Sequence, residues 1–440
     1  MSFDLQGNSL TGASQNGAAQ FAAALQQLSN YAGDPLGLAE QVIAAEPGFV
    51  MAHVLKAWLY LLGTDAKAAA AIQAAIAEAE KLPSNAREQG HVAAVKALAG
   101  GRFHQASRII EDVSVHHPRD LLALIAGHQL DFFTGNSRML RDRIGRAAPH
   151  WSPSMAGYHS LLGMHAFGLE EMGDYARAED KGREALSLQR HDGWAKHAVA
   201  HVLEMQGRHD DGIRFMREDV EGWTKDSFFA VHNWWHLALY HLERGDEAAV
   251  LELADGPITT VAQNQMMDLV DASALLWRLS LRGIDPGKRW AALVARYEDL
   301  WVPGYYAFND LHAVMAFLGA GRQDLVEATL AAQMDAEADN IAFSNDVGLP
   351  LIQGFIAFHK GDHAKAVSLM RPVRNIAARF GGSHAQRDII DLTLLEAALR
   401  GGDAALAQAL TAERAEAKHD SPLVAMFARR AAMLPETVAA

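Results

Sequence analysis

The apolar positions of this chain recur at helical spacing, and the apolar segments end at glycines that are placed at nearly regular intervals. The spacing between successive glycines is 34 to 40 residues, and the glycines are Gly63, Gly101, Gly135, Gly173, Gly207, Gly245, Gly283, Gly321, Gly361 and Gly401. A glycine that ends one helix before the next begins, repeated with this period, is typical of stacked helical hairpins. The pattern predicts an all-α fold, a right-handed superhelical solenoid of hairpins.

The same pattern predicts how the chain is divided. Residues 1–18 are rich in Gly, Ser, Asn and Gln, which predicts a mobile lead-in or an atypical cap. From Ala19 the helical pattern continues, so we expect one continuous solenoid over residues 19–440. We call the helix before each glycine the A helix and the helix after it the B helix. The B helices carry more charge and are expected on the outside, whereas the A helices are expected to line the concave face.

Composition and charge narrow the class of protein. Asp and Glu outnumber Lys and Arg by 53 to 39, giving a net charge of −14, which disfavours nucleic acid and anionic membranes as partners. The segment from Met1 to Asn8 lacks the order of charges in a signal peptide, and no uncharged apolar stretch is long enough for a membrane helix, so we expect a cytoplasmic protein. There is no Cys, which excludes disulfides, thiolate ligands and a Cys nucleophile.

Several sequence blocks resemble known helical repeats. The stretch GDYARAE at 173–179 resembles the turn and second-helix start of tetratricopeptide repeats (TPR). The longer segment from Tyr158 to Arg289 is similar to the bacterial and animal family named for tetratricopeptide repeat protein 38. The blocks that carry this similarity are HAFGLEE at 165–171, WAKHAVAHVLEMQGR at 194–208, HNWWHLALY at 232–240 and VDASALLWRL at 270–279. The resemblance implies a TPR-like fold over most of the chain and implies no particular activity.

The 21 histidines are placed regularly along the A helices. One imidazole lies seven to ten residues before the glycine in seven repeats, at His53, His91, His128, His165, His197, His236 and His312. In a stacked array these side chains form a stripe, which predicts a binding surface on the concave wall. A histidine that bridges neighbouring helices by a hydrogen bond produces the same recurrence. For His53, His91 and His128 we favour this packing interpretation.

The histidines are densest in the middle repeats. His197 and His201 are four residues apart, as are His232 and His236, and Glu204 follows His201 by three, so each set projects from one side of its helix. Imidazoles with a carboxylate are a ligand set for Zn²⁺, Fe²⁺ or Mn²⁺. The four histidines are therefore candidate ligands of a divalent metal. The spacing leaves packing, a polar or catalytic pocket and a metal site open, and it does not require any cofactor.

Two acidic residues lie at a comparable height in the following repeats. Asp271 and Asp310 are close to the level of His232, and a carboxylate beside an imidazole orients it and raises its basicity, as a general base needs. The candidate catalytic residues are His201, His236, Asp271 and Asp310. The candidate ligand-binding residues are His159, His165, His197, Glu204, His232, Trp235 and His312.

Two functions fit these patterns. The first is a TPR-like repeat protein that binds a peptide, a protein or a small molecule on a His-rich concave face, which predicts an open groove. The second is an enzyme, a metal-assisted or His/Asp acid–base hydrolase, which predicts a closed cavity in the middle repeats and shifted histidine pKa values. No phosphate-binding loop, nucleophile elbow or His-Glu-x-x-His motif occurs in the sequence. We place the binding protein first because solenoids are seldom enzymes.

Overall fold

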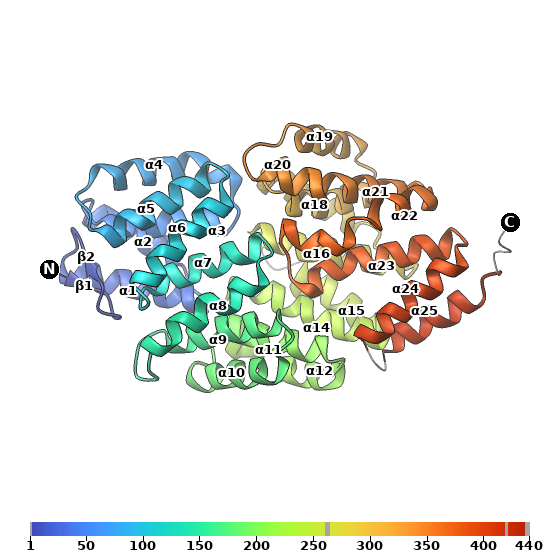
Figure 1. Ribbon diagram of the computed structural model, residues 1–440, viewed down its shortest axis with the longest axis horizontal. Coiled ribbons are helices and arrows are strands. Elements are labelled where there is room, and N and C mark those ends of the chain that lie inside the picture. The colour runs from blue at the N-terminus through green and yellow to red at the C-terminus, as the bar shows by residue number, and fades with distance from the viewer. Residues whose placement is uncertain (1, 260–264, 419–420, 436–440) are drawn as a thin grey trace. The chain divides into compact units, whose positions relative to one another are not determined.

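The computed structural model describes residues 2–259, 265–418 and 421–435. In these residues the chain is an all-α solenoid of TPR-like helical hairpins, with twenty-five α-helices and one two-stranded β-hairpin (Figure 1). The chain divides into two compact units. Unit 1 comprises Met1–Val202 and Asp219–Asn233, and unit 2 comprises Leu203–Glu218 and Trp234–Ala440. Each unit is described by itself below.

Unit 1 begins with the antiparallel strands β1 (Ser2–Phe3) and β2 (Ser9–Leu10). Its helices are α1 (Gln15–Asn30), α2 (Pro35–Ala45), α3 (Val50–Leu62), α4 (Ala69–Lys81), α5 (Ala86–Ala99), α6 (Phe103–His116), α7 (Leu121–Phe133), α8 (Ser137–Ala147), α9 (Tyr158–Glu170), α10 (Tyr175–Leu188) and α13 (Val220–Thr224). Short 3₁₀ turns lie at Ala66–Ala68 and Ala148–His150. Helices α11 (Gly193–Met205) and α14 (Ala230–Arg244) begin in unit 1 and end in unit 2.

The other helices belong to unit 2. They are α12 (His209–Arg217), α15 (Glu247–Leu253), α16 (Met266–Leu281), α17 (Arg289–Leu300), α18 (Ala307–Gly319), α19 (Gln323–Met334), α20 (Asn340–Phe343), α21 (Leu349–His359), α22 (His363–Met370), α23 (His384–Arg400), α24 (Ala404–Ala417) and α25 (Pro422–Ala432). Two π-helical turns, Ala254–Ile258 and Ser344–Gly348, and one 3₁₀ segment, Arg374–Phe380, complete this unit.

Glycines in the left-handed conformation end most of the A helices, as the sequence predicts. After α9, Gly173 has a φ of 79°, its N–H donates to the Glu170 carbonyl, and the Asp174 N–H donates to the Leu169 carbonyl. These bonds satisfy carbonyls that the helix end leaves without intrahelical donors. Positive φ angles occur at Gly101, Gly135, Gly173, Gly207, Gly245, Gly283, Gly321 and Gly361.

The first and last glycines of the series also end their A helices, as C-cap residues, but without a positive φ angle. Gly63 and Gly401 have φ angles of −74° and −78°, and the left-handed residues are the next ones, Thr64 (φ 51°) and Gly402 (φ 75°). At Gly401–Gly402 either glycine is able to adopt a positive φ, so sequence spacing alone does not choose between them.

The A helices form the core and the B helices cover it. In α7, twelve of thirteen residues are buried, whereas four of eleven are buried in α8. In unit 2, α18 has twelve buried residues of thirteen and α19 has three of twelve. A helix that is buried all round has no solvated face, so any polar side chain on it needs a partner on a neighbouring element.

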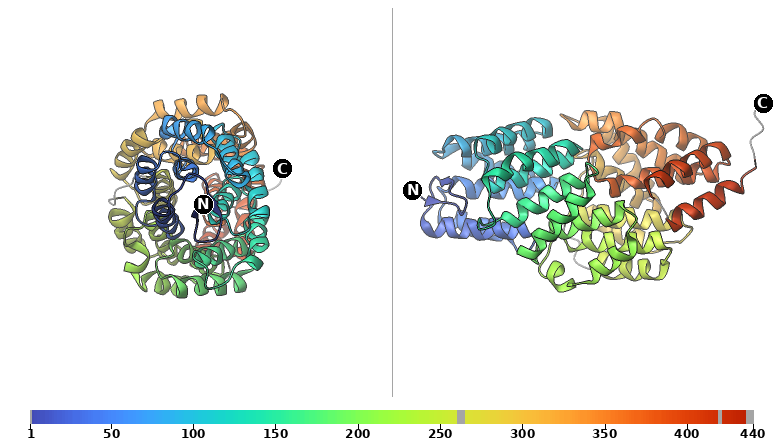
Figure 2. Two further views of the ribbon diagram at one scale, coloured as in Figure 1. Left: turned by 90° about the vertical axis from the view of Figure 1, so that its left-hand side faces the viewer. Right: turned by 60° about the horizontal axis from the view of Figure 1, so that its bottom comes forward.

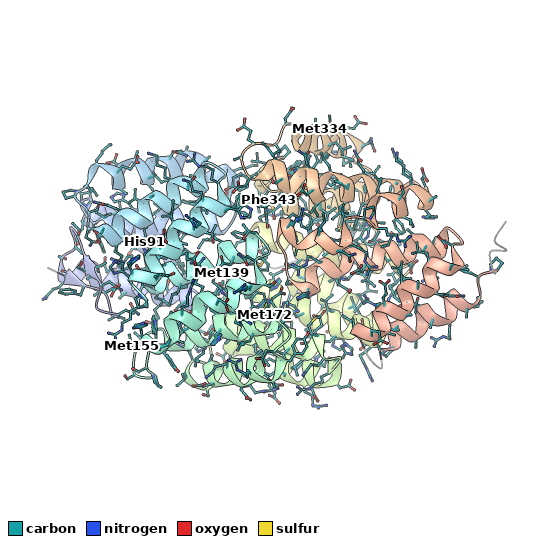
Figure 3. The ribbon with its side chains drawn as sticks, in the orientation of Figure 1. His91, Met139, Met155, Met172, Met334 and Phe343 are labelled. Carbon is teal, nitrogen blue, oxygen red and sulfur yellow. The ribbon has the colours of Figure 1, made fainter. Side chains whose placement is uncertain are left out.

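In unit 1 such partners link three successive A helices. His91 of α5 is labelled in Figure 3. The Trp58 indole of α3 donates to Nδ1 of His91 over 3.2 Å, and Nε2 of His91 lies 2.9 Å from Oδ2 of Asp120, the N-cap residue of α7. Since Nδ1 accepts, Nε2 carries the hydrogen and donates to the carboxylate. Arg87 donates to the same oxygen over 2.6 Å. These bonds are those of a packing histidine.

The first residues of the chain are hydrogen-bonded to later repeats. Gln6 Nε2 donates to the Ala156 carbonyl, Arg87 Nη2 donates to the Ser9 carbonyl, and the Thr11 N–H donates to Glu88 Oε1, each over 2.9 Å. Helix α1 starts at Gln15, so the predicted boundary at residue 18 falls inside it. The division into residues 1–18 and a continuous solenoid over 19–440 stays a prediction.

The end of α1 meets the segment that precedes α14. The Tyr31 carbonyl accepts from the Phe228 N–H over 3.1 Å, and the Gly33 N–H donates to the Asp226 carbonyl over 2.8 Å. The Tyr31 hydroxyl accepts from Gln129 Nε2 of α7 over 2.7 Å. The end-on view in the left panel of Figure 2 brings the dark blue N-terminal elements of unit 1 to the front. These bonds join the beginning and the end of unit 1.

One helical segment, Asn340–His359, is long and apolar enough to cross a membrane by length and composition alone. Of its apolar window, 56% is buried inside the protein. Core helices of proteins that do not enter membranes pass the same test, so this is weak evidence for a membrane span.

The close approach of α8 and α9 gives a test of the hairpin packing. A Cβ on Gly168 of α9 would lie 2.5 Å from backbone atoms of Leu140 and Arg141. We expect Gly168→Ala to lower the free energy of unfolding by about 1–3 kcal/mol because the backbones are forced apart. Gly145→Ala on α8, where a Cβ meets nothing within 4 Å, is expected to raise it by about 0.5–1 kcal/mol. Urea unfolding of both variants measures this, and equal effects would contradict the packing.

Candidate functional site

Unit 1 contains a cavity of about 280 Å³ that opens beside the N-terminal hairpin. Its walls come from the hairpin turn, from α1, from the loop that precedes α9 and from the end of α10. The lining residues are Asp4, Leu5, Gln6, Ala22, Leu25, Gln26, Ser29, Leu121, Pro153, Met155, Ala156, Gly157, Tyr158, His159, Leu188 and Gln189. Met155, labelled in Figure 3, marks the loop that forms one side. Of the predicted ligand-binding residues, His159 lines this cavity.

The ring of His159 is held by a buried carboxylate. Nδ1 of His159 lies 2.7 Å from Oδ2 of Asp192, whose side chain is fully buried. The other oxygen, Oδ1, accepts from the Ala195 N–H in the first turn of α11 over 2.8 Å. Because Asp192 accepts from Nδ1, the hydrogen of the neutral imidazole lies on Nδ1 and Nε2 is an acceptor. His159 thus brings an oriented basic nitrogen to the cavity.

The hairpin turn adds acceptor groups to the same cavity. Oε1 of Gln6 is buried and has no hydrogen-bond partner among the described residues, while Nε2 is bonded to Ala156. Asp4 accepts from the N–H groups of Gln6 and Asn8 over 3.0 and 2.7 Å. Burial raises the pKa of Asp4 above its usual value, although the bonds from Asn8 lower it. A buried acceptor without a donor costs free energy, which a ligand that donates would recover.

The His159–Asp192 pair has a counterpart two repeats earlier. Arg87 and His159 are both second residues of A helices, and Asp120 and Asp192 both cap the next A helix, 33 residues later in each case. At the earlier position Arg87 is buried and its second nitrogen donates to the Ser9 carbonyl. At the later position the arginine is replaced by a histidine that faces the cavity. The contact with the N-cap aspartate is therefore the same at both positions, but the side chain that makes it is a buried arginine at the first and a histidine in the cavity wall at the second.

A second cluster in unit 1 brings together three of the predicted metal ligands. One nitrogen of each of His197, His201 and His232 lies within 4.8 Å of the others, and all three side chains are buried. Nε2 of His197 and Nε2 of His232 are 3.0 Å apart. Helices α11 and α14 therefore bring these three histidines together, and their role as metal ligands stays a prediction.

Carboxylates from α9 and the residue after it lie next to this cluster. Oε2 of Glu170 is 3.5 Å from Nδ1 of His201, and Glu170, Glu171 and His201 form a second group whose ligand atoms lie within 4.8 Å of one another. Neither glutamate is among the candidate residues predicted from the sequence. Both stand in the block at 165–171 that carries the family resemblance, but only the folded chain shows that α9 meets α11 at this level.

The predicted stripe of histidines on an open groove differs from the structure. His53, His91, His128, His197, His236 and His312 are buried, and His165 is partly buried. His53 Nε2 is bonded to the Pro47 carbonyl over 2.9 Å, a packing contact like that of His91. Because these side chains are buried or partly buried, they do not line an open surface.

The remaining predicted residues belong to unit 2, where charged groups surround them. Nδ1 of His236 lies 3.2 Å from Oε2 of Glu204, and the other oxygen of Glu204 is 3.6 Å from Lys418 Nζ. Lys418 is buried, which lowers its pKa, but Asp388, Glu243 and Glu204 outweigh burial and the pKa is raised. The cavity beside them has a volume of only about 20 Å³, close to that of one water. A ligand role for Glu204 and His236 stays a prediction.

Asp310 anchors a loop of unit 2. Its carboxylate accepts from the Trp301 indole over 2.7 Å, from the Gly304 N–H over 3.0 Å and from Gln333 Nε2 over 2.5 Å. Burial raises its pKa to about 7, although the three hydrogen bonds lower it. These partners hold the turn between α17 and α18.

The other candidates of unit 2 are also buried in its core. Asp271 is fully buried, Trp235 stacks under the Arg278 guanidinium at 5.3 Å, and Nδ1 of His312 lies 2.8 Å from the Phe308 carbonyl. Burial lowers the pKa of His312 to about 4. Catalytic roles for Asp271 and Asp310 and ligand roles for Trp235 and His312 stay predictions.

Several groups around the cavity were missed in the sequence. Asp192 carries the signal of a helix N-cap, an Asp just before an apolar helical segment. Its separation of 33 residues from His159 is one less than the spacing of Gly173 and Gly207. Asp4 and Gln6 lie in the polar lead-in, where nothing in the local pattern indicates contact with residues 150 positions later.

Comparisons with known proteins add little to this site. No family model matches the chain. Among solved structures, a complex described as the structure of Naa15/Naa10 bound to HypK-THB matches with 13% sequence identity over 93% of this chain and 70% of that chain, with a TM-score of 0.23. Nothing about the site or the partners of this chain is taken from so distant a likeness.

The buried histidine His128 gives a pH-dependent test. It packs edge-on against Phe167 and Trp194, and burial, followed by the charge of Arg143, lowers its pKa to about 3. The folded-state pKa is below the unfolded value of 6.5, so this stabilisation is present above pH 6.5 and is lost as the pH falls toward 3. We expect a loss of about 2 kcal/mol by pH 5 from this group.

His128→Leu is expected to reduce the slope of unfolding free energy against pH between 6.5 and 5, whatever its effect at pH 7.5. The exposed residue His116 serves as the control, and His116→Leu is expected to keep the slope of the natural protein. Denaturant unfolding at several pH values measures both. An unchanged slope in His128→Leu would mean that His128 does not titrate as a buried neutral group.

Proposed function

We propose that this TPR-like repeat protein binds a small organic amine in the 280 Å³ cavity of unit 1. The observation that carries the proposal is the set of acceptors that converge there: Nε2 of His159, Oε1 of Gln6 and the carboxylate of Asp4. Ligand pockets combine apolar walls with a few placed polar groups, and Leu25, Leu121, Met155 and Tyr158 supply apolar walls here.

The charge of the lining favours a cation over an anion. Asp4 lines the cavity, and none of the described lining residues is Lys or Arg. An ammonium group donates hydrogen bonds and accepts none, which matches a site made of acceptors. A bound cation would also favour the ionised form of Asp4, which burial disfavours.

The fold and the net charge of the chain are also compatible with amine binding. The TPR-like repeat fold supports a binding role, because repeat solenoids commonly bind their partners on extended surfaces. The net charge of −14 supports the exclusion of nucleic acid and anionic membranes, and a cytoplasmic location remains part of the proposal. Binding of a peptide or protein would place an amino group, such as a chain N-terminus or a Lys side chain, in the same cavity.

The test compares 1,4-diaminobutane with 1,4-butanediol, which has the same length and no charge. We expect the diamine to bind at least about tenfold more tightly, since a charge-assisted hydrogen bond contributes about 1.5–3 kcal/mol. Calorimetric titration and the shift in Tm measure the two affinities. Gln6→Leu, Asp4→Asn and His159→Phe are each expected to weaken binding of the diamine. Only Asp4→Asn, which removes the charge, is expected to leave binding of the diol unaffected.

Asp180→Asn is the matched control for Asp4→Asn, because Asp180 is exposed on α10 of the same unit. It is expected to retain full affinity for the diamine. Equal binding of diamine and diol, binding of neither, or equal loss in Asp180→Asn and Asp4→Asn would each overturn the amine proposal.

The Asp192–His159 pair favours a second candidate function, general-base hydrolysis in the same cavity. In this reaction Nε2 of His159 takes a proton from water, whose oxygen attacks an ester carbonyl and displaces the alcohol. With 4-nitrophenyl acetate as the probe, the products are acetate and 4-nitrophenol. We expect His159→Gln to abolish any hydrolysis above the buffer rate, and Asp192→Asn to reduce it. A rate equal to that of buffer would remove this candidate and leave amine binding in place.

A further inference from the structure

The histidine cluster of unit 1 is separate from the amine cavity and is built from different helices. His197 and His201 stand one helical turn apart on α11, and His232 stands in the first turn of α14. Their ring centroids are 4.3 Å apart for His197 and His201 and 4.8 Å apart for His197 and His232. Three imidazoles from two helices therefore converge on one point of the interior.

The nitrogen separations are close to those around a metal ion. Two histidine nitrogens at about 2.0–2.1 Å from a tetrahedral Zn²⁺ are about 3.3 Å apart. Nε2 of His197 and Nε2 of His232 are 3.0 Å apart, and the ligand atoms of all three histidines lie within 4.8 Å. Small side-chain rotations bring such nitrogens to coordinating positions around one ion.

A carboxylate stands behind one of the rings. Nδ1 of His201 lies 3.5 Å from Oε2 of Glu170, which leaves Nε2 as the nitrogen for a metal. Histidine ligands commonly donate their second N–H to a carboxylate, which fixes the ring and increases its basicity. The negative charge also offsets the charge of a buried divalent ion, and Glu171 adds a second carboxylate to this group.

Aromatic side chains enclose the cluster. The ring centroid of Phe167 lies 5.2 Å from that of His197 and 5.3 Å from that of His201. The ring centroids of Trp194 and His197 are 4.8 Å apart. Phe229 covers His232 at 4.9 Å. The exposed fractions of His197, His201 and His232 are 2%, 0% and 4%. An ion held here is shielded from solvent.

We propose that His197, His201 and His232 bind one divalent transition-metal ion, Zn²⁺ in the first instance, with Glu170 positioning His201. The ion would fasten the first part of α11 to the start of α14 and would be taken up as unit 1 folds, because the folded site is closed. This proposal does not rest on amine binding, and its test does not use an amine.

The experiment measures metal in the full-length chain expressed without a histidine tag and purified without chelator. We expect about one zinc per chain by plasma mass spectrometry, and a Tm that falls by several degrees when a chelator removes the ion from unfolded protein before refolding. Refolding with Co²⁺ is expected to give the visible absorption of a tetrahedral nitrogen site. This spectrum tests the site in the natural sequence and needs no variant.

Variants then assign the ligands. His197→Ala and His232→Ala are expected to lose the bound metal and the Co²⁺ spectrum, and His201→Gln serves as a milder change in case the alanine variants do not fold. His53→Ala is the matched control, because His53 is a buried histidine of the same unit that packs against the Pro47 carbonyl. This variant is expected to keep one ion per chain.

The outcomes are distinct. The proposal is overturned if neither Zn²⁺ nor Co²⁺ changes the Tm or the spectrum of the refolded chain, in which case the His197–His232 contact is an ordinary hydrogen bond. It is also overturned if the histidine variants retain the ion, which would place the metal elsewhere. Failure of amine binding in the separate titration leaves this result unaffected.

Discussion

Most of this structure depends on one constraint, which is that a helix buried on every side has to satisfy its polar side chains through its neighbours. Helices such as α7 and α18 bury twelve of their thirteen residues, and the buried residues of the A helices include histidines, carboxylates and arginines. One solution is a set of hydrogen bonds between side chains of successive repeats, as among Trp58, His91, Asp120 and Arg87. Asp131 and Arg143 show another, since a carboxylate on α7 is bound by two nitrogens of the arginine on α8. Removing one member of such a set leaves the other buried without its partner, so these positions tolerate little change.

The constraint also explains what the sequence predicts well and what it does not. The helical hairpins follow from local signals, namely apolar periodicity and a glycine after each A helix. The B helices α10 and α12, for example, begin two residues after Gly173 and Gly207. The surroundings of each polar residue are set by neighbours one repeat away. The same pattern of recurring histidines was therefore compatible with an open stripe, whereas the structure shows a buried row. His159 differs from the others because its neighbours in space include the hairpin at the start of the chain, which no periodicity relates to residue 159.

The two candidate sites of unit 1 differ in how their residues relate to the equivalent residues of other repeats. His159 contacts the N-cap aspartate of the next A helix, as Arg87 does two repeats earlier. With histidine in place of arginine, the residue that makes this contact also lines a cavity. At His197, His201 and His232 the site instead concentrates imidazoles that other repeats carry singly. In both places the proposed site lies where one repeat differs from its neighbours while the packing contacts are kept.

The bonds between the end of α1 and the segment before α14 have a consequence for how the chain is made. The Tyr31 carbonyl accepts from the side chain of Ser227, which lies 196 residues later. At a synthesis rate of about 5–20 residues per second, the first helix waits roughly 10 to 40 s for this partner to emerge from the ribosome. During that interval Tyr31 lacks the backbone contact that joins the two ends of unit 1. A repeat protein is usually expected to fold outward from any point, but here the first repeats gain their last contacts only when translation has reached the start of α14.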